Sequence, residues 1–400
     1  MRLAKWLLGL AVALAVLIVF ALGISLLLYP PQYVYRVLAW RESDSFDWQK
    51  FPFHPLHSSA TPVPFPVELD PRVETLFADL AGAEDWNQFL THQRTQAFVV
   101  VQDGVIRYEQ YFNDTQRDSI VTSFSVAKSF VSTLIGFAIQ DGYISSVDDP
   151  ITRYLPELTQ RDVNFEKITI RDLLRMASGL DYREFRPLLL NGDDPLTTYY
   201  PDQRKISLEN PKIVGEPGVQ FHYNKYHPQL LGMILERTTG VSPTAYLQTK
   251  IWDELGMEYD GSWSVDSVKS DFEKMESGLN GRAVDFAKFG QFILDNGQVR
   301  GQQILSPEWV AEATQPWQPE DPASYYPDSF TARPGDPYYA YMWWGFDRGD
   351  GSYDFAAAGD KGQYIYISPA KRLVIVRHGI DYGIPYNEWL ALFYKFASQY

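Results

Sequence analysis

The longest uninterrupted pattern along the chain is an apolar run near its N-terminus. Residues 7–28 carry no charged side chain, and Ser25 is the one clearly polar residue among these 22. At about 1.5 Å per residue, a helix of that length spans roughly 33 Å, enough for a bilayer core of about 30 Å. The run also exceeds the apolar segment of about 7–15 residues typical of a signal peptide. The pattern therefore predicts an uncleaved membrane helix, with a cleaved signal peptide as the alternative.

Basic residues flank this apolar run on both sides. Arg2 and Lys5 precede it, and Arg36 and Arg41 follow it. The positive-inside tendency places the N-terminus in the cytoplasm, although the two arginines on the far side weaken the bias. We expect a single-pass anchor over residues 1–29, with the rest of the chain outside the cytoplasm, either periplasmic or extracellular.

The segment that follows, residues 30–66, is rich in proline and aromatic residues. It holds seven prolines, several of them alternating with phenylalanine as in the stretch FPFHP at 51–55. Such a composition disfavours a helix and favours extended backbone. The segment is expected to be a linker or an arm that wraps the body.

From residue 67 onwards the apolar positions alternate between strand and helix spacing. A helix is expected over 73–90, and two β-rich runs, 97–101 and 105–112, flank Asp103-Gly104, a strong hairpin signal. Four further helices, each ending on a residue that tolerates the left-handed cap conformation, are expected over 126–140, 170–177, 228–239 and 283–296. The C-terminal part returns to strands and closes with a helix, over 363–367, 373–377 and 387–398.

Strands at both ends of the chain thus surround a helical insert. This order predicts an α+β fold in which a discontinuous sheet domain, 67–137 with 285–400, packs against a helical domain over 138–284. About 335 residues are available for folding, which is enough for a substantial core.

Composition and charge exclude several classes of protein. The chain has no cysteine, so disulfides, thiolate metal sites and a cysteine nucleophile are excluded. The net charge is −15, and without Arg2 and Lys5 the remainder has 33 − 50 = −17. Such an acidic body is not built to bind phosphate backbones, so nucleic acid is not expected as a partner. The six histidines form no standard metal spacing, and we expect neither a metal nor an organic cofactor.

Candidate chemistry lies at the start of the helix expected over 126–140. Ser125 and Lys128 are three positions apart, so on a helix their side chains share one face. A neutral lysine can take the proton of a serine hydroxyl if its pKa falls from about 10.4 towards 7–8, at a cost of roughly 4 kcal/mol. That shift requires burial or a neighbouring cation. The same spacing recurs at Ser368 and Lys371, where it is interpreted as an ordinary turn between two strands, so the spacing alone is weak evidence.

Several segments, in order along residues 95–400, resemble the serine hydrolases of the β-lactamase and penicillin-binding-protein superfamily, and within it the esterases, amidases and 6-aminohexanoate-dimer hydrolases. These segments are 122–129 (TSFSVAKS), 147–156 (VDDPITRYLP), 168–180 (ITIRDLLRMASGL), 217–240 (PGVQFHYNKYHPQLLGMILERTTG) and 359–376, which begins GDKGQ and contains LVIV. The resemblance implies a five-stranded antiparallel sheet flanked by helices, beside an all-helical domain, with the active site between them.

The resemblance also implies roles for individual residues. Ser125 is similar to the acylated nucleophile, Lys128 to its base, and Tyr223 to the phenol that relays a proton to or from the leaving group. Tyr226 is the alternative candidate for this phenol. Asp360 would offer its backbone N–H to an oxyanion, opposite the N–H of Ser125, at the end of the stretch closed by Gly359.

Two departures from the family pattern bear on the substrate. Lys225 stands where many relatives carry asparagine, and it either lowers the pKa of Lys128 or points to solvent. The lysine of the Lys-Thr-Gly strand of β-lactamases is replaced by 357–359 (AAG), beside the carboxylate of Asp360. This loss disfavours penicillin-like anions, so a neutral or cationic substrate is expected.

An aromatic cluster lies between residues 338 and 344. Its members include Tyr339 and Trp344, which either wall an acyl pocket or pack in the core. The sequence as a whole predicts a membrane-anchored serine hydrolase that opens a small-molecule ester or amide through an acyl-enzyme. The alternatives are a β-lactamase or DD-peptidase, or a non-catalytic penicillin-binding-like receptor or cell-wall-binding module.

Overall fold

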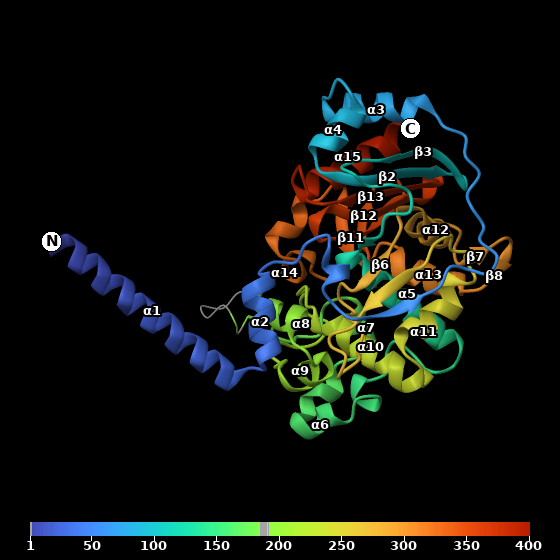
Figure 1. The fold of residues 1–400 in the computed structure, drawn as a ribbon. Helices are drawn as coiled ribbons and strands as arrows, with labels where there is room; N and C mark the ends of the chain where they lie inside the picture. Colours follow the sequence, from blue (N-terminus) through green and yellow to red (C-terminus); the bar gives the residue numbers. More distant parts are fainter. Residues whose placement is uncertain (1, 185–189, 191) are drawn as a thin grey trace.

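The computed structural model describes residues 2–184, 190 and 192–400. Its largest sheet is antiparallel and has seven strands (Figure 1). Its strands come from both ends of the sequence and run in the order β3-β2-β13-β12-β11-β10-β9. Their bounds are β2 (Thr95–Gln102), β3 (Val105–Tyr111), β9 (Asp336–Tyr339), β10 (Trp344–Asp347), β11 (Tyr353–Gly359), β12 (Gln363–Ser368) and β13 (Leu373–Gly379). The hairpin around Asp103-Gly104 is confirmed, since β2 and β3 pair directly across it.

Helices cover both faces of this sheet (Figure 1). On one face lie α3 (Pro71–Ala81), α4 (Trp86–His92) and α15 (Tyr386–Gln399), and α12 (Ala283–Leu294) packs on the other. Strands β2, β12 and β13 are buried along nearly their whole length, which explains their continuous apolar runs. The expected C-terminal strands and closing helix are confirmed.

The middle of the chain is helical, as the spacing of its apolar residues predicts. Helix α5 (Ala127–Gln140) runs through the centre of the molecule and packs against α10 (Tyr226–Thr239). The remaining helices of this region are α6 (Glu157–Arg161), α7 (Ile170–Leu174), α8 (Asp193–Tyr199), α9 (Gln203–Glu209) and α11 (Pro243–Leu247). A second, four-stranded sheet, in the order β1-β5-β6-β4, consists of β1 (Phe53–Leu56), β4 (Val121–Thr122), β5 (Gly261–Ser264) and β6 (Leu279–Gly281). The division into domains at 137/138 and 284/285 stays a prediction.

The sheet is larger than the five strands expected. Strands β9 and β10 extend it at one edge, where Trp344 lies opposite both Tyr339 and Ala356. They come from the aromatic cluster between 338 and 344, whose residues do not alternate between apolar and polar. Tyr338 and Tyr339 of β9 and Trp344, Gly345 and Phe346 of β10 are consecutive buried residues, so the period of two that identifies a strand with one exposed face is missing.

Two helix expectations are also corrected. The stretch 73–90 forms α3 and α4 because Gly82 takes the left-handed conformation, with φ 64°, and ends the first helix. The proline-rich segment 30–66 contains a helix, α2 (Pro31–Trp40), where extended backbone was expected. Its prolines lie at 30–31 and from 52 onwards, so Pro31 occupies the first helical position, where a missing N–H costs nothing.

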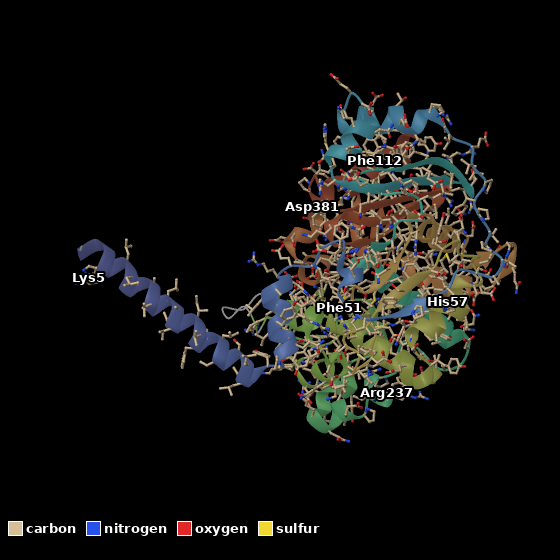
Figure 2. All side chains as sticks on the ribbon, viewed as in Figure 1. Lys5, Phe51, His57, Phe112, Arg237 and Asp381 are labelled. Atoms are coloured by element: carbon tan, nitrogen blue, oxygen red, sulfur yellow. The ribbon has the colours of Figure 1, made fainter. Side chains whose placement is uncertain are left out.

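The apolar N-terminal run forms helix α1 (Arg2–Leu28), which projects away from the body (Figure 1). Figure 2 shows its side chains surrounded by no other part of the protein, from the labelled Lys5 towards the body. Its side chains from Lys5 to Leu28 are exposed, apart from a half-buried Ser25. The helix is long and apolar enough to cross a membrane or to serve as a signal sequence.

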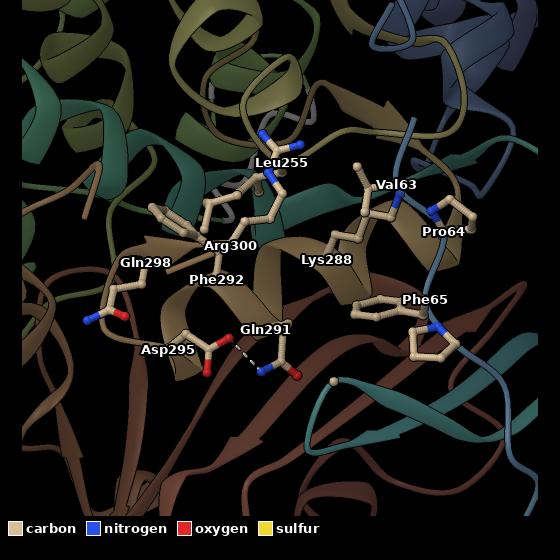
Figure 3. A pocket seen from close by; sticks show the side chains of 13 residues that line it. Val63, Pro64, Phe65, Leu255, Lys288, Gln291, Phe292, Asp295, Gln298 and Arg300 are labelled. Carbon is tan, nitrogen blue, oxygen red and sulfur yellow. Dashed lines mark hydrogen bonds between the residues drawn. The ribbon is translucent and has the colours of Figure 1, made fainter. Parts of the chain in front are cut away.

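After α2 the chain wraps the body in extended form. Val63 and Phe65 lie over α12 and enclose a cavity of about 230 Å³ with Leu255, Lys288 and Phe292 (Figure 3). Phe65 packs against the main hydrophobic core. The second half of the 30–66 segment thus lies against the body, and its assignment as a linker or an arm stays a prediction.

The added edge of the sheet supplies a test of its packing. In β10, Gly345 lies directly under the ring of the buried Tyr338, and a Cβ atom at position 345 would overlap that ring. Gly345→Ala should therefore destabilise the protein by about 1–3 kcal/mol through overpacking, measured as a shift of the unfolding midpoint in urea. Gly215→Ala is the matched control, because its nearest neighbouring atom would lie 3.8 Å away. Equal midpoints for the two variants would contradict this arrangement.

Candidate active site

A strained turn presents Ser125 at the start of the central helix. Strand β4 ends at Thr122, and a short 3₁₀ turn, Phe124–Val126, leads into α5. Phe124 has φ 48°, in the left-handed region that non-glycine residues rarely adopt. This turn leaves Ser125 half-buried at the surface of a cavity, while the residues on either side of it are buried.

The predicted Ser125–Lys128 pair is in direct contact. Lys128 Nζ lies 2.8 Å from Ser125 Oγ and 2.7 Å from the backbone carbonyl oxygen of Glu276, which accepts a hydrogen bond from the amine. The side chain comes from the first turn of α5, and only 1% of the residue is exposed. The helix therefore holds a lysine amine, shielded from water, against the serine hydroxyl.

The surroundings of Lys128 favour its neutral form. Burial is the main cause and the charge of Lys225 the next, and together they lower the pKa of Lys128 to about 7. The carboxylates of Glu276 and Asp194 act in the opposite direction without cancelling the effect. A large fraction of the Lys128 amine is thus unprotonated near neutral pH and can accept a proton.

Tyr223 completes a three-residue cluster. Lys128 Nζ lies 5.1 Å from the centre of the Tyr223 ring. Burial raises the pKa of Tyr223 to about 12, although the neighbouring Ser125 side chain and the charge of Lys225 oppose the shift. The phenol is therefore protonated at neutral pH, so it can donate a proton, whereas Lys128 can accept one.

Lys225 does not point into free solvent. It forms an ion pair with Asp194, the second residue of α8. Burial lowers the pKa of Lys225, but the Asp194 carboxylate outweighs it and raises the pKa above its usual value. Lys225 thus stays charged, and of the two roles considered for it, this geometry favours the cation that lowers the pKa of Lys128.

A second ion pair lies beneath the cluster. Lys274 and Glu276 are both buried, and their charged atoms are 2.8 Å apart. Glu276 also accepts a hydrogen bond from Gln229 of α10 at 2.5 Å, while its backbone carbonyl holds Lys128. This pair fixes the carbonyl that positions the Lys128 amine.

Strand β11 brings Gly359 and Asp360 to the serine. A Cβ atom at Gly359 would lie 3.0 Å from the Ser125 backbone nitrogen and 2.5 Å from the carbonyl oxygen of Ser123. Only glycine permits so close an approach. Asp360 follows at the end of the strand and lines the same cavity as Ser125, with its carboxylate accepting from the backbone N–H of Lys361.

The aromatic residues Tyr339 and Trp344 belong to both the core and the site. Both are buried on β9 and β10, and both rings contact Tyr223: Trp344 stacks on it at 5.7 Å and Tyr339 meets it edge-on at 6.4 Å. They position the phenol, and Trp344 also walls a cavity of about 740 Å³ beside it. Tyr339 does not line the cavities on either side of the cluster.

Other residues considered from the sequence lie outside the chemistry. Tyr226 is fully buried, with its hydroxyl bonded to Asp193 and Asn210, so it is a structural residue of α10. His227 is buried against the Ser178 hydroxyl, and burial lowers its pKa to about 3. The second Ser-x-x-Lys match forms the turn between β12 and β13, as expected.

Three charged residues of the site were missed from the sequence: Asp194, Lys274 and Glu276. Asp194 follows Asp193 at the start of a helix, where acidic residues are common for reasons of the helix dipole alone. Lys274 and Glu276 lie in a loop with no motif around them. Asp194 lies 31 residues from its partner Lys225, and Glu276 lies 148 residues from Lys128, so local spacing carries no signal of these two contacts.

Acidic and histidine side chains within the described ranges do not gather into a metal-binding group of three or more. The cavity next to Ser125 has a volume of about 750 Å³, large enough for a small-molecule substrate. The arrangement offers a nucleophile on the wall of that cavity, a buried neutral amine in contact with the nucleophile, and a phenol that lines the neighbouring cavity of about 740 Å³.

Comparison with known proteins agrees with this geometry. The beta-lactamase family model matches residues 87–378. A 6-aminohexanoate-dimer hydrolase from Paenarthrobacter ureafaciens is 26% identical over 347 residues, which cover 80% of this chain and 83% of the relative. A D-aminopeptidase from Brucella anthropi is 26% identical over 172 residues, 40% of this chain and 31% of the relative.

Solved structures share the fold at lower identity. A Bacillus anthracis protein, assigned provisionally as a 6-aminohexanoate-dimer hydrolase, superposes with a TM-score of 0.72 at 22% identity, covering 92% of this chain and 94% of the other. A class C beta-lactamase superposes with a TM-score of 0.59 at 17% identity, covering 82% and 96%. The family match extends over most of the chain and includes the helix that carries Ser125 and Lys128, so the chain belongs to the beta-lactamase family of serine hydrolases.

Proposed function

We propose that this protein hydrolyses an ester or amide through an acyl-enzyme formed on Ser125. The observation that carries the proposal is the 2.8 Å contact between Ser125 Oγ and a buried Lys128 amine whose pKa is lowered to about 7. A serine hydroxyl needs a base to become a nucleophile, and the Lys128 amine lies within hydrogen-bond distance of that hydroxyl.

In the first step the neutral Lys128 amine takes the Ser125 hydroxyl proton while Ser125 Oγ bonds to the substrate carbonyl carbon. The amine keeps its hydrogen bond to the Glu276 carbonyl, and in its neutral form it can turn its lone pair towards the serine hydroxyl 2.8 Å away. The negative charge passes to the carbonyl oxygen. Backbone N–H groups of Ser125 and Asp360 are placed to hold this oxyanion, and one such donor contributes about 3–4 kcal/mol.

In the second step the bond to the leaving group breaks, and the alcohol or amine departs with a proton. Tyr223 is the donor, because its phenol is protonated at neutral pH and lies beside both Ser125 and Lys128. The proton held on Lys128 then restores the phenol. Water then attacks the acyl-enzyme, and the proton transfers of acylation run in the reverse direction. The acid is released, and a proton returns to Ser125 Oγ.

The substrate is proposed to be a neutral or cationic ester or amide. The 6-aminohexanoate-dimer hydrolase among the relatives supports an amide. Carboxylates outnumber cations on the described wall of the cavity that contains Ser125. The carboxylates are Glu42, Glu184, Asp194 and Asp360, the cations are Arg41, Lys225 and Lys361, and Lys225 is paired with Asp194. An anionic substrate would therefore meet a wall with a net negative charge.

Helix α1 is proposed to anchor this hydrolase in a membrane, with the body outside the cytoplasm. The exposed apolar side chains between Trp6 and Leu28 are unfavourable in water and favourable in a bilayer. The alternative role as a cleaved signal sequence would show as a mature protein shortened by the length of α1.

Labelling of Ser125 tests the nucleophile. A fluorophosphonate probe should label the full chain at Ser125, and Ser125→Ala should abolish both labelling and hydrolysis of p-nitrophenyl acetate. Ser368→Ala is the matched control, since it removes a serine of the same Ser-x-x-Lys spacing whose buried hydroxyl has no hydrogen-bond partner in the described structure. Unchanged hydrolysis in Ser125→Ala would refute the proposal, and rapid turnover of a chromogenic cephalosporin would favour a β-lactamase instead.

The pH profile tests the base. Because Lys128 must be neutral to act, kcat/KM should fall about tenfold per pH unit below about pH 7. Lys225→Met removes a cation that lowers the pKa of Lys128 and leaves the Asp194 carboxylate unpaired, and both changes raise that pKa. The acid limb should therefore move to higher pH.

Lys205→Met is the control for this shift, because Lys205 forms an exposed pair on α9 and should leave the profile unchanged. An acid limb that stays in place in Lys225→Met, or a flat profile in the unsubstituted protein, would exclude Lys128 as the base.

A further inference from the structure

Helix α2, immediately after the proposed membrane span, is built into the catalytic body. Tyr33 is fully buried, and its hydroxyl donates to the carbonyl oxygen of Leu190 at 2.7 Å. Its ring lies 5.5 Å from that of Tyr200, just after α8. Figure 1 shows α2 lying along the body beside α8, whereas α1 leaves it. The helix is thus a docked element and not a loose tether.

Arg36 fastens the next turn of α2. The residue is 2% exposed, and its guanidinium donates to the backbone carbonyls of Tyr199, at 3.0 Å, and Asp266, at 2.7 Å. It also lies over the rings of Trp40 and Phe51, and Figure 2 labels Phe51 within the body, close to α2. A buried arginine held by two carbonyls and two rings fixes the helix rigidly.

This docking makes α2 a wall of the active-site cavity. Five residues from its C-terminal end and the following turn line the cavity that contains Ser125, namely Val37, Leu38, Arg41, Glu42 and Ser43. Leu38 is 53% exposed and Val37 is partly buried, so both contribute apolar surface to the cavity wall. The adjoining part of the wall is α8, against which α2 packs and which carries Asp194, the partner of Lys225.

The length of the chain places this wall close to the proposed membrane. Helix α1 ends at Leu28 and α2 begins at Pro31, so only two residues separate them. The ten residues of α2 extend about 15 Å at 1.5 Å per residue. The part of the cavity beside Leu38, near the C-terminal end of α2, is therefore held within about 22 Å of the end of the span, counting two linking residues at most about 7 Å long.

We infer that α2 is a specificity-determining element that takes the substrate from the membrane surface. The substrate is then an amphiphilic ester or amide, anchored in the bilayer by an apolar chain that passes along Val37 and Leu38 to bring its carbonyl carbon to Ser125. The rigid docking of α2 sets the height of the cavity above the bilayer. This inference rests on the serine hydrolase and the membrane anchor proposed above.

The experiment uses the full chain reconstituted in phosphatidylcholine vesicles and two probes. One is p-nitrophenyl acetate, which is dissolved in water, and the other is p-nitrophenyl myristate, which resides in the bilayer. A flexible Gly/Ser segment of about twelve residues, spanning about 20 Å on average, is inserted between Leu28 and Tyr29. This insertion keeps α2 on the body but removes the fixed height above the membrane.

We expect the insertion to lower hydrolysis of the vesicle-borne myristate about tenfold or more while leaving hydrolysis of the acetate unchanged. The same segment inserted between Gly349 and Asp350, in the exposed turn between β10 and β11, is the control and should change neither rate. Equal myristate hydrolysis by the anchor insertion and the control would overturn the inference.

A point variant tests the apolar wall independently of the insertion. Leu38→Glu places a charge where the apolar chain should pass, so it should lower the preference for myristate over acetate about tenfold. Val163→Glu is the matched control, because Val163 is 62% exposed and does not line the cavity. An unchanged preference in Leu38→Glu would overturn the inference.

These outcomes are distinct from a failure of the proposed function. If Ser125 is not the nucleophile, acetate hydrolysis persists in Ser125→Ala. That result refutes the proposed function itself, whatever the preference between acetate and myristate. If Ser125 is the nucleophile but substrate comes from solution, acetate and myristate respond alike to the insertion. The second result overturns the role of α2 and leaves the hydrolase intact.

Discussion

The burial of one lysine amine is the constraint on which the rest of the site depends. Lys128 lies in the centre of the molecule, on a helix packed on all sides, and burial is the main reason that its pKa falls to about 7. A charged amine at this position would be costly, and the free energy of that desolvation favours the neutral form of the amine. The surrounding residues are arranged accordingly: a carbonyl from Glu276 orients the amine, and the cation of Lys225 adds to the shift.

This constraint connects parts of the chain that are far apart. Lys225 keeps its charge because of Asp194 on α8, and α8 is held in turn by α2 through Tyr33 and Arg36. The segment after the apolar N-terminal helix therefore contributes to the same packed unit as the catalytic lysine. The Lys225–Asp194 ion pair and the segment that follows α1 meet where α2 packs on α8, so the same contacts set the wall of the cavity and the surroundings of Lys128.

Much of the architecture follows from the sequence. The period of the apolar residues gives α5, α10, α12, α15 and the strand pairs near both termini, because these elements are long and strongly patterned. The sequence did not reveal β9 and β10, which are buried on both faces, or α2, whose prolines lie outside its interior. Similarly, the spacing of Ser125 and Lys128 identifies a candidate pair, yet Ser368 and Lys371 have the same spacing and form only a turn.

The sequence by itself determined the membership of the chain in a serine hydrolase superfamily, the order of its elements and the residues able to act as nucleophile, base and phenol. These are local properties, fixed by residue type and by spacing within one helix or hairpin. Only the tertiary structure decided that Lys128 is buried, that Lys225 pairs with Asp194, and that residues of α2 line the cavity that contains Ser125. Desolvation and ion pairing depend on which segments, far apart in the sequence, come together in the fold. The residue pattern within one helix or hairpin does not contain that information.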